Sequence, residues 1–113
     1  MWRTLPFLLL LASCSKGPDA DLPSIGEARS LTAEWALVNE QASAGKLTAT
    51  YTDTMRKQLR EQLQSTAKSL KQPDSHYCQE VRAVLAQPDD AQPTELRAHA
   101  DALKQIEDSL ESA

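Results

Sequence analysis

Apolar residues recur at intervals of three and four along most of the chain after residue 24, the spacing that gathers side chains on one face of an α-helix. The first stripe of this kind consists of Ile25, Ala28, Leu31, Trp35, Val38 and Ala42. Ser24 and Glu27 stand at its start with the spacing of a capping box, and Gly45 follows its end. We therefore predict a first helix from Ser24 to about Gly45, with Trp35 as its largest contribution to a core.

A second stripe predicts a helix over residues 48–70. Its apolar positions are spaced mostly by four and are Tyr51, Met55, Leu59, Leu63, Ala67 and Leu70. The beginning of this segment is ambiguous, because every second residue from 48 to 54 is a threonine, as in a strand. No partner strand is visible, so the helix is the preferred interpretation, and Pro73 ends the element.

Two shorter patterns complete the chain. Asp74 or Ser75 is placed to cap a third helix, whose inward positions are Cys78, Val81, Val84 and Leu85. Pro88 breaks this helix, and a fourth begins near Pro93, a residue suited to a first helical turn. Its seam consists of Leu96, His99, Leu103, Ile106, Leu110 and Ala113. This seam is too short for an autonomous coiled coil.

Composition favours helices over strands as well. The 113 residues include only three Gly, and residues of high helix propensity such as Ala, Leu, Glu and Gln are abundant. The predicted fold class is all-α, either a small three- or four-helix bundle or a helical hairpin, preceded by a flexible tether. Large apolar side chains are few for a body of this size, so completion of the core by a partner or a second copy stays open.

The N-terminus follows a different pattern. It reads MWRTLPFLLLLASC, with Arg3 ahead of an apolar run from Leu5 to Ala12 and small residues before Cys14. Such a run is too short to span a bilayer, which takes about 20 residues. It has instead the parts of a secretory signal. The string Leu-Ala-Ser-Cys resembles the lipobox of bacterial lipoproteins, and this resemblance covers residues 1–16.

The resemblance implies an anchor and a location. Residues 1–13 are a signal peptide that is removed, and Cys14 becomes the acylated first residue of the mature protein, bound to the membrane through its lipid. Ser15, in place of Asp, resembles an outer-membrane address, facing the periplasm. Residues 14–23 are then the lipidated cysteine and a flexible tether, which when fully extended could hold a helical domain of residues 24–113 roughly 30 Å from the membrane. The alternative is an ordinary secretory signal that leaves Cys14 as a plain thiol.

The charge of the chain argues against a nucleic-acid partner, and its uneven distribution suggests an anionic envelope component as an alternative partner. The formal net charge is −4, which argues against nucleic acid because phosphate binding takes a dominant cationic surface. Residues 46–73 nevertheless hold six basic and two acidic residues, whereas residues 74–113 hold three basic and nine acidic. Either a basic helix lies against an acidic one, or the basic residues bind an anionic envelope component such as lipid, lipopolysaccharide or peptidoglycan. The candidate residues are Arg56, Lys57, Arg60, Lys68 and Lys71.

The remaining chemical candidates are weak. If Cys14 is acylated, Cys78 is an unpaired thiol, which is either buried and inert or joined to another chain by a disulfide. His76 and Glu80 share a helical face that Cys78 does not, so they supply too few ligands for zinc. No phosphate loop and no catalytic triad stand out. We therefore expect no cofactor, no metal and no enzymatic activity.

Together these features predict a membrane-tethered helical module that binds a protein partner or itself through its apolar faces. Two alternatives are retained. In one, the basic second helix binds an anionic envelope component. In the other, the chain is an inhibitory or immunity lipoprotein directed at a periplasmic target.

Overall fold

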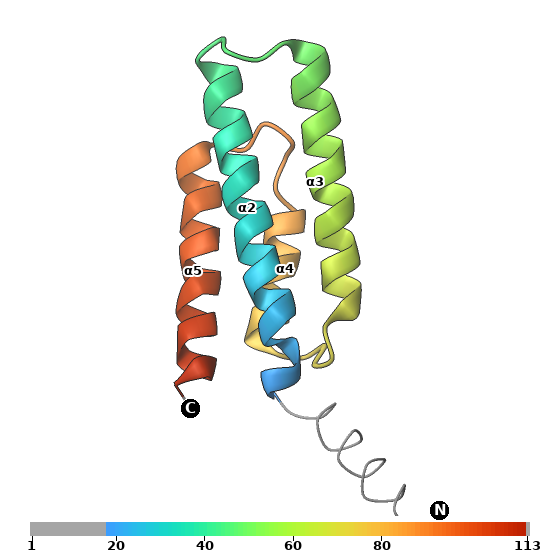
Figure 1. The fold of residues 1–113 in the computed structure, drawn as a ribbon, viewed down its shortest axis with the longest axis vertical. Coiled ribbons are helices and arrows are strands. Elements are labelled where there is room, and N and C mark those ends of the chain that lie inside the picture. Colours follow the sequence, from blue (N-terminus) through green and yellow to red (C-terminus); the bar gives the residue numbers. More distant parts are fainter. Residues whose placement is uncertain (1–17, 113) are drawn as a thin grey trace, which may run out of the picture.

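The computed structural model describes residues 18–112, which form one short 3₁₀ helix and four α-helices (Figure 1). These are η1 (Pro18–Asp21), α2 (Leu22–Ser43), α3 (Ala49–Ser69), α4 (His76–Leu85) and α5 (Pro93–Glu111). No strand occurs in this range, so the predicted all-α class is confirmed. The threonine-rich start of α3 is helical, since Thr48 is its N-cap and accepts a hydrogen bond from the Tyr51 N–H at 3.1 Å.

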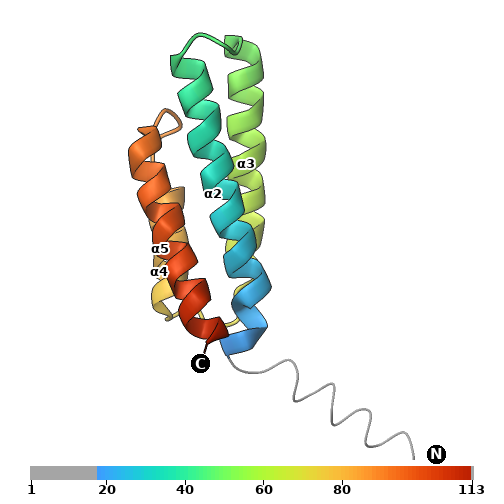
Figure 2. The same ribbon diagram turned by 60° about the vertical axis from the view of Figure 1, so that its left-hand side comes forward.

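Successive helices run in opposite directions and form an up-down-up-down bundle (Figures 1 and 2). Helix α2 lies between α3 and α5, and α4 packs against α3 and α5 behind it. The hairpin alternative is therefore wrong, because α4 and α5 close over α2 and α3. Helix α4 has only 10 residues, so the connected ends of α2 and α3 project beyond it. We call this projection, residues 37–55, the hairpin end.

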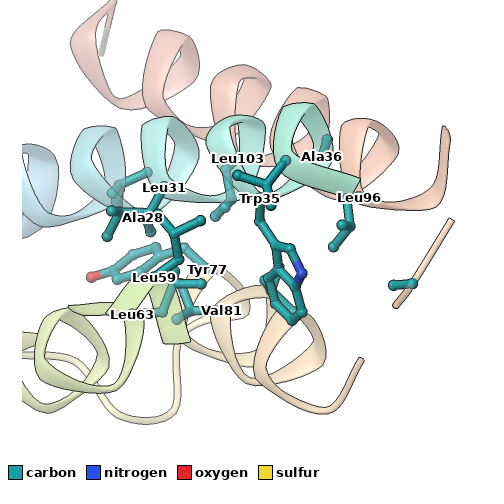
Figure 3. Close-up of a cluster of buried hydrophobic side chains, with 14 residues drawn as sticks. Ala28, Leu31, Trp35, Ala36, Leu59, Leu63, Tyr77, Val81, Leu96 and Leu103 are labelled. Atoms are coloured by element: carbon teal, nitrogen blue, oxygen red, sulfur yellow. The ribbon is translucent and has the colours of Figure 1, made fainter. Parts of the chain in front are cut away.

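The core draws on all four α-helices. Figure 3 shows Trp35 of α2 pointing into the same interior as Leu59 and Leu63 of α3 and Leu103 of α5. Trp35 is 1% exposed, as its predicted central role requires. The inward positions predicted for the other helices are largely confirmed. One exception is Tyr51, which is 51% exposed.

Several predicted helix ends are confirmed by their hydrogen bonds. Gly45 has a φ of +74°, and the N–H groups of Gly45 and Lys46 reach the carbonyls of Ala42 and Gln41 at 3.0 Å each. This is the Schellman motif, in which one residue takes a left-handed backbone conformation. Glycine adopts that conformation without strain. Ser75 caps α4 by accepting from the Cys78 N–H at 3.2 Å. Such caps fix where each turn begins.

The predicted start of the first helix is wrong. The helix begins at Leu22, and Ser24 lies inside it, with its hydroxyl 3.0 Å from the Ser69 hydroxyl. Asp21 is fully buried, and its carboxylate accepts from the Tyr77 hydroxyl at 2.6 Å and from the Lys71 N–H at 2.8 Å. These long-range bonds draw residues 18–23, predicted as tether, into the folded body. Residues 14–17 of that tether lie outside the described residues.

The predicted pairing of basic and acidic helices is also wrong. Acidic α5 packs on α2 rather than on basic α3, which lies across the bundle from it. Its ion pairs with α2 are Glu107 to Arg29 at 2.8 Å and Arg97 to Glu40 at 3.0 Å. Apolar stripes, more than net charge, therefore set the helix order, as expected when exposed ion pairs contribute about 0–1 kcal/mol each.

The Tyr77 hydroxyl generates a test of the Asp21 contact. Tyr77→Phe leaves the buried carboxylate without one of its two donors, and a hydrogen bond to a charged group contributes about 1.5–3 kcal/mol. We expect the free energy of unfolding at pH 7 to fall by about that amount, measured by urea denaturation. Tyr51→Phe is the control, because that ring is half exposed and its loss of a hydroxyl changes stability little.

Tyr77 also predicts a loss of stability at alkaline pH. Burial, followed by the hydrogen bond to Asp21, raises the pKa of Tyr77 from 10.0 to about 12. The unfolded chain therefore releases this proton near pH 10, whereas the folded chain retains it until about pH 12. Stability contributed by the protonated phenol is complete below pH 10 and is lost as pH rises towards 12. Urea midpoints across this window should fall more steeply for the native chain than for Tyr77→Phe, and equal slopes would contradict the assignment.

Candidate functional site

Helix α3 presents its basic residues in two directions. Lys57 and Lys68 are exposed, and their separation of eleven positions amounts to about three turns, which places them on one face. Arg56 and Arg60 are half-buried and turn toward the rest of the bundle. The structure therefore does not gather the predicted basic residues into one surface. Lys71 lies beyond the end of α3, where it is exposed.

Arg60 holds the connection between α4 and α5. Its two Nη atoms donate to the carbonyls of Leu85 and Gln87 at 2.7 and 2.8 Å. Its Nε and one Nη also contact the Asp89 carboxylate, at 3.1 and 2.9 Å. The guanidinium carbon stands 4.9 Å from the centre of the Trp35 ring, within range of a cation–π interaction. These contacts satisfy carbonyl groups that the end of α4 leaves free, so Arg60 acts in folding.

Arg56 lies one turn earlier and borders a polar hollow. Its Nε donates to the Asn39 side-chain oxygen at 2.8 Å. Asn39 is 4% exposed, and its amide nitrogen donates to the carbonyls of Asp89 and Ala91 at 3.1 and 2.8 Å. The adjoining hollow, here named the polar hollow, has a volume of about 340 Å³ and is lined by Asn39, Ala42, Ser43, Arg56, Asp90, Ala91, Gln92 and Pro93.

A second hollow, here named the apolar hollow, lies at the hairpin end. It has a volume of about 280 Å³ and is lined by Glu34, Leu37, Val38, Gln41, Leu47, Tyr51 and Met55. Leu37 and Tyr51 are each 51% exposed, and they are the large apolar side chains that the described residues leave open to solvent. Glu34 is the only acidic or basic residue in the lining. The arrangement suits an apolar side chain that has a cation next to it.

The helical pattern of the sequence does not indicate this hollow. Leu37 falls outside the core stripe, directly beside the inward-facing Ala36 and Val38. The stripe of α3 predicts Tyr51 to be in the core, because Tyr51 continues that stripe by one turn. A large apolar residue off the stripe of an amphipathic helix was the available signal, although single exposed leucines are common.

Cys78 is the thiol of the described residues, and it is 4% exposed. It faces inward on α4, as predicted, beside the buried Val81. A disulfide to another chain requires α4 to move outward, so burial favours the inert alternative. Cys14, the predicted lipidation site, lies outside the described residues.

The histidines take part in local contacts. His99 is half-buried on α5, with its Nδ1 2.8 Å from a carboxylate oxygen of Glu80 on α4. Glu80 therefore pairs across helices rather than with His76, its predicted neighbour on the same face. Within residues 18–112 no three potential ligands cluster as a metal site requires. In the same range no helix has the length and apolar character needed to cross a membrane.

Arg60 provides a prediction that separates folding from binding. Arg60→Ala leaves the Leu85 and Gln87 carbonyls and the Asp89 carboxylate without their donors, and we expect the free energy of unfolding to fall by about 2–3 kcal/mol. Arg60→Lys keeps the charge but loses the planar fork, so it should recover only part of this loss. Lys57→Ala, on the exposed side of the same helix, should change stability by less than about 0.5 kcal/mol in the same urea titration. Equal losses at positions 57 and 60 would contradict the role of Arg60.

Comparison with known proteins adds no relative. No family model matches the chain, and neither a curated protein nor a solved structure does so. The function is therefore inferred from the residues and the geometry of the chain itself.

Proposed function

We propose that this chain is a lipid-anchored protein of the bacterial envelope that binds an amphipathic helix of a protein partner in the apolar hollow. The observation that carries the proposal is the joint exposure of Leu37 and Tyr51 on either side of that hollow. Exposed aromatic and aliphatic side chains around a pocket are typical of the residues that dominate binding energy at interfaces. The lipobox resemblance of residues 1–16 supplies the anchor and the envelope location.

The small volume of the hollow favours a side-chain anchor over a small-molecule ligand. Its volume of about 280 Å³ lies at the lower limit of ligand pockets, which span roughly 300–1,000 Å³. An apolar helix face that lays one large residue into a groove needs no more room. Glu34 on the wall adds a preference for Lys or Arg next to that anchor residue. The occupant we propose is therefore an amphipathic helix with a basic flank.

The position of the hollow suits a tethered protein. If Cys14 is acylated, only residues 14–17 separate the lipid from η1, a span of at most about 14 Å. Helix α2 has 22 residues and so extends roughly 33 Å between η1 and the hairpin end. The apolar hollow then lies near the end of α2 that is distant from the membrane, where a periplasmic partner is accessible. An inhibitory or immunity role is this same proposal with a specific target.

Site-specific photo-cross-linking in intact envelopes tests the proposal. A photoreactive residue at Leu37 should yield one discrete product with a protein partner, whereas the same residue at the exposed Gln64 of α3 should not. Leu37→Glu should weaken that association by about 2 kcal/mol or more if the position is a binding hot spot. Cys14→Ala should reduce the product by releasing the protein from the membrane.

The other outcomes separate the alternatives. A product of twice the chain mass from Leu37 identifies a second copy as the occupant, and the proposed partner helix is then wrong. Equal products from Leu37 and Gln64, or none, would remove the apolar hollow as the binding surface. Loss of salt-sensitive binding to anionic envelope material in Cys14→Ala, Lys57→Gln, Lys68→Gln, compared with Cys14→Ala alone, would favour the anionic-component alternative. These lysines are chosen because Arg60 is needed for folding.

A further inference from the structure

The described residues contain three half-buried arginines, and two of them are paired with carboxylates. Arg29 contacts Glu107 at 2.8 Å, and Arg60 contacts Asp89 at 2.9 Å. Arg56 has no ion pair with any residue in the range 18–112, although it is half-buried like the others. A guanidinium partly removed from water without a counter-charge is unfavourable. Among the half-buried arginines of residues 18–112, Arg56 is therefore the one without a carboxylate partner.

The surrounding contacts hold Arg56 in a fixed orientation. Only its Nε is bonded within the described residues, to Asn39 at 2.8 Å. Asn39 is itself fixed by bonds to the carbonyls of Asp89 and Ala91, so it acts as a rigid support. Arginine has five N–H donors, and its Nη atoms match the two oxygens of a carboxylate. The contact with Asn39 thus orients the guanidinium while leaving that pair of donors available.

The polar hollow supplies space next to this guanidinium. Arg56 of α3 and Pro93, the first residue of α5, both belong to its lining. The N-cap of α5, Gln92, makes no side-chain capping bond, and Glu95 is the acidic residue of the first turn. The lining of the hollow also includes Asp90, whose exposed carboxylate repels negative charge on a ligand.

We propose that the polar hollow binds a carboxylate, held through the two Nη atoms of Arg56. The nearby Asp90 favours a ligand with a single negative charge over one with two, which distinguishes a carboxylate from a phosphate monoester. The carboxylate belongs either to a small free acid or to the C-terminus of a peptide. This site shares no lining residue with the apolar hollow and does not depend on the function proposed for it.

NMR titration of the full chain in an uncharged detergent, with sodium acetate as the probe, tests this site. We expect saturable shifts of the Arg56 Nε–H signal and of the Ala91 and Gln92 amides, beyond those caused by sodium chloride at equal ionic strength. Arg56→Gln should abolish them. Asp90→Asn should tighten acetate binding several-fold by removing a like charge, and because Asp90 is exposed this variant should fold normally.

Matched controls and probes make each outcome decisive. Arg82→Gln removes an exposed arginine of α4 and should leave acetate binding unchanged. A tripeptide with a free C-terminus that binds at least tenfold more tightly than its amidated form and than acetate identifies a chain terminus as the ligand. Equal binding of tripeptide and acetate identifies a small acid. Absent shifts, shifts that persist in Arg56→Gln, or tighter binding of inorganic phosphate than of acetate would overturn the proposal.

Discussion

The fold depends most on how the segment between α4 and α5 is fastened to the other two helices. Trp35 and Asn39 of α2 both donate to the Asp89 carbonyl, at 3.0 and 3.1 Å, and Arg60 of α3 reaches the Leu85 and Gln87 carbonyls. A segment without regular structure leaves backbone oxygens that need donors when they are buried. Here side chains of two different helices supply the donors, and this brings α4 and α5 onto the α2–α3 hairpin.

The same fastening shapes the surfaces that remain for binding. Because Arg60 is committed to the α4–α5 segment, α3 has only its outward lysines to offer as exposed cations. Because Asn39 is also committed to this segment, Arg56 is drawn to the border of the polar hollow. The hairpin end projects beyond the short α4, and Leu37 and Tyr51 are exposed there. The contacts of Arg60 and Asn39 with the α4–α5 segment therefore also decide which cations remain for the candidate binding surfaces.

The sequence predicted what depends on local chemistry. The stripes around Trp35 and Leu103, the turn at Gly45 and the cap at Ser75 were correct, because periodicity and capping act within a few residues. The start of the first helix was wrong because Asp21 finds its partners 50 and 56 residues away, where no local pattern records them. The basic surface was drawn from α3 alone, and nothing nearby in the sequence shows that Arg60 bonds to carbonyls 25 and 27 residues on. Both candidate hollows depend on the packing of separate segments, which periodicity does not reveal.

The Asp21 contact has a mechanical consequence for a chain anchored at its N-terminus. If the chain is anchored through Cys14 as proposed, a pull from the membrane reaches the described residues at η1, next to the beginning of α2. Asp21 joins this point to the backbone of Lys71 and to the Tyr77 side chain on α4, so the load is shared with a second helix and its preceding turn. The force would then act on both hydrogen bonds of Asp21 together, and not on successive turns of α2 alone. The buried carboxylate of Asp21 would therefore spread a force applied at the N-terminus over several parts of the bundle.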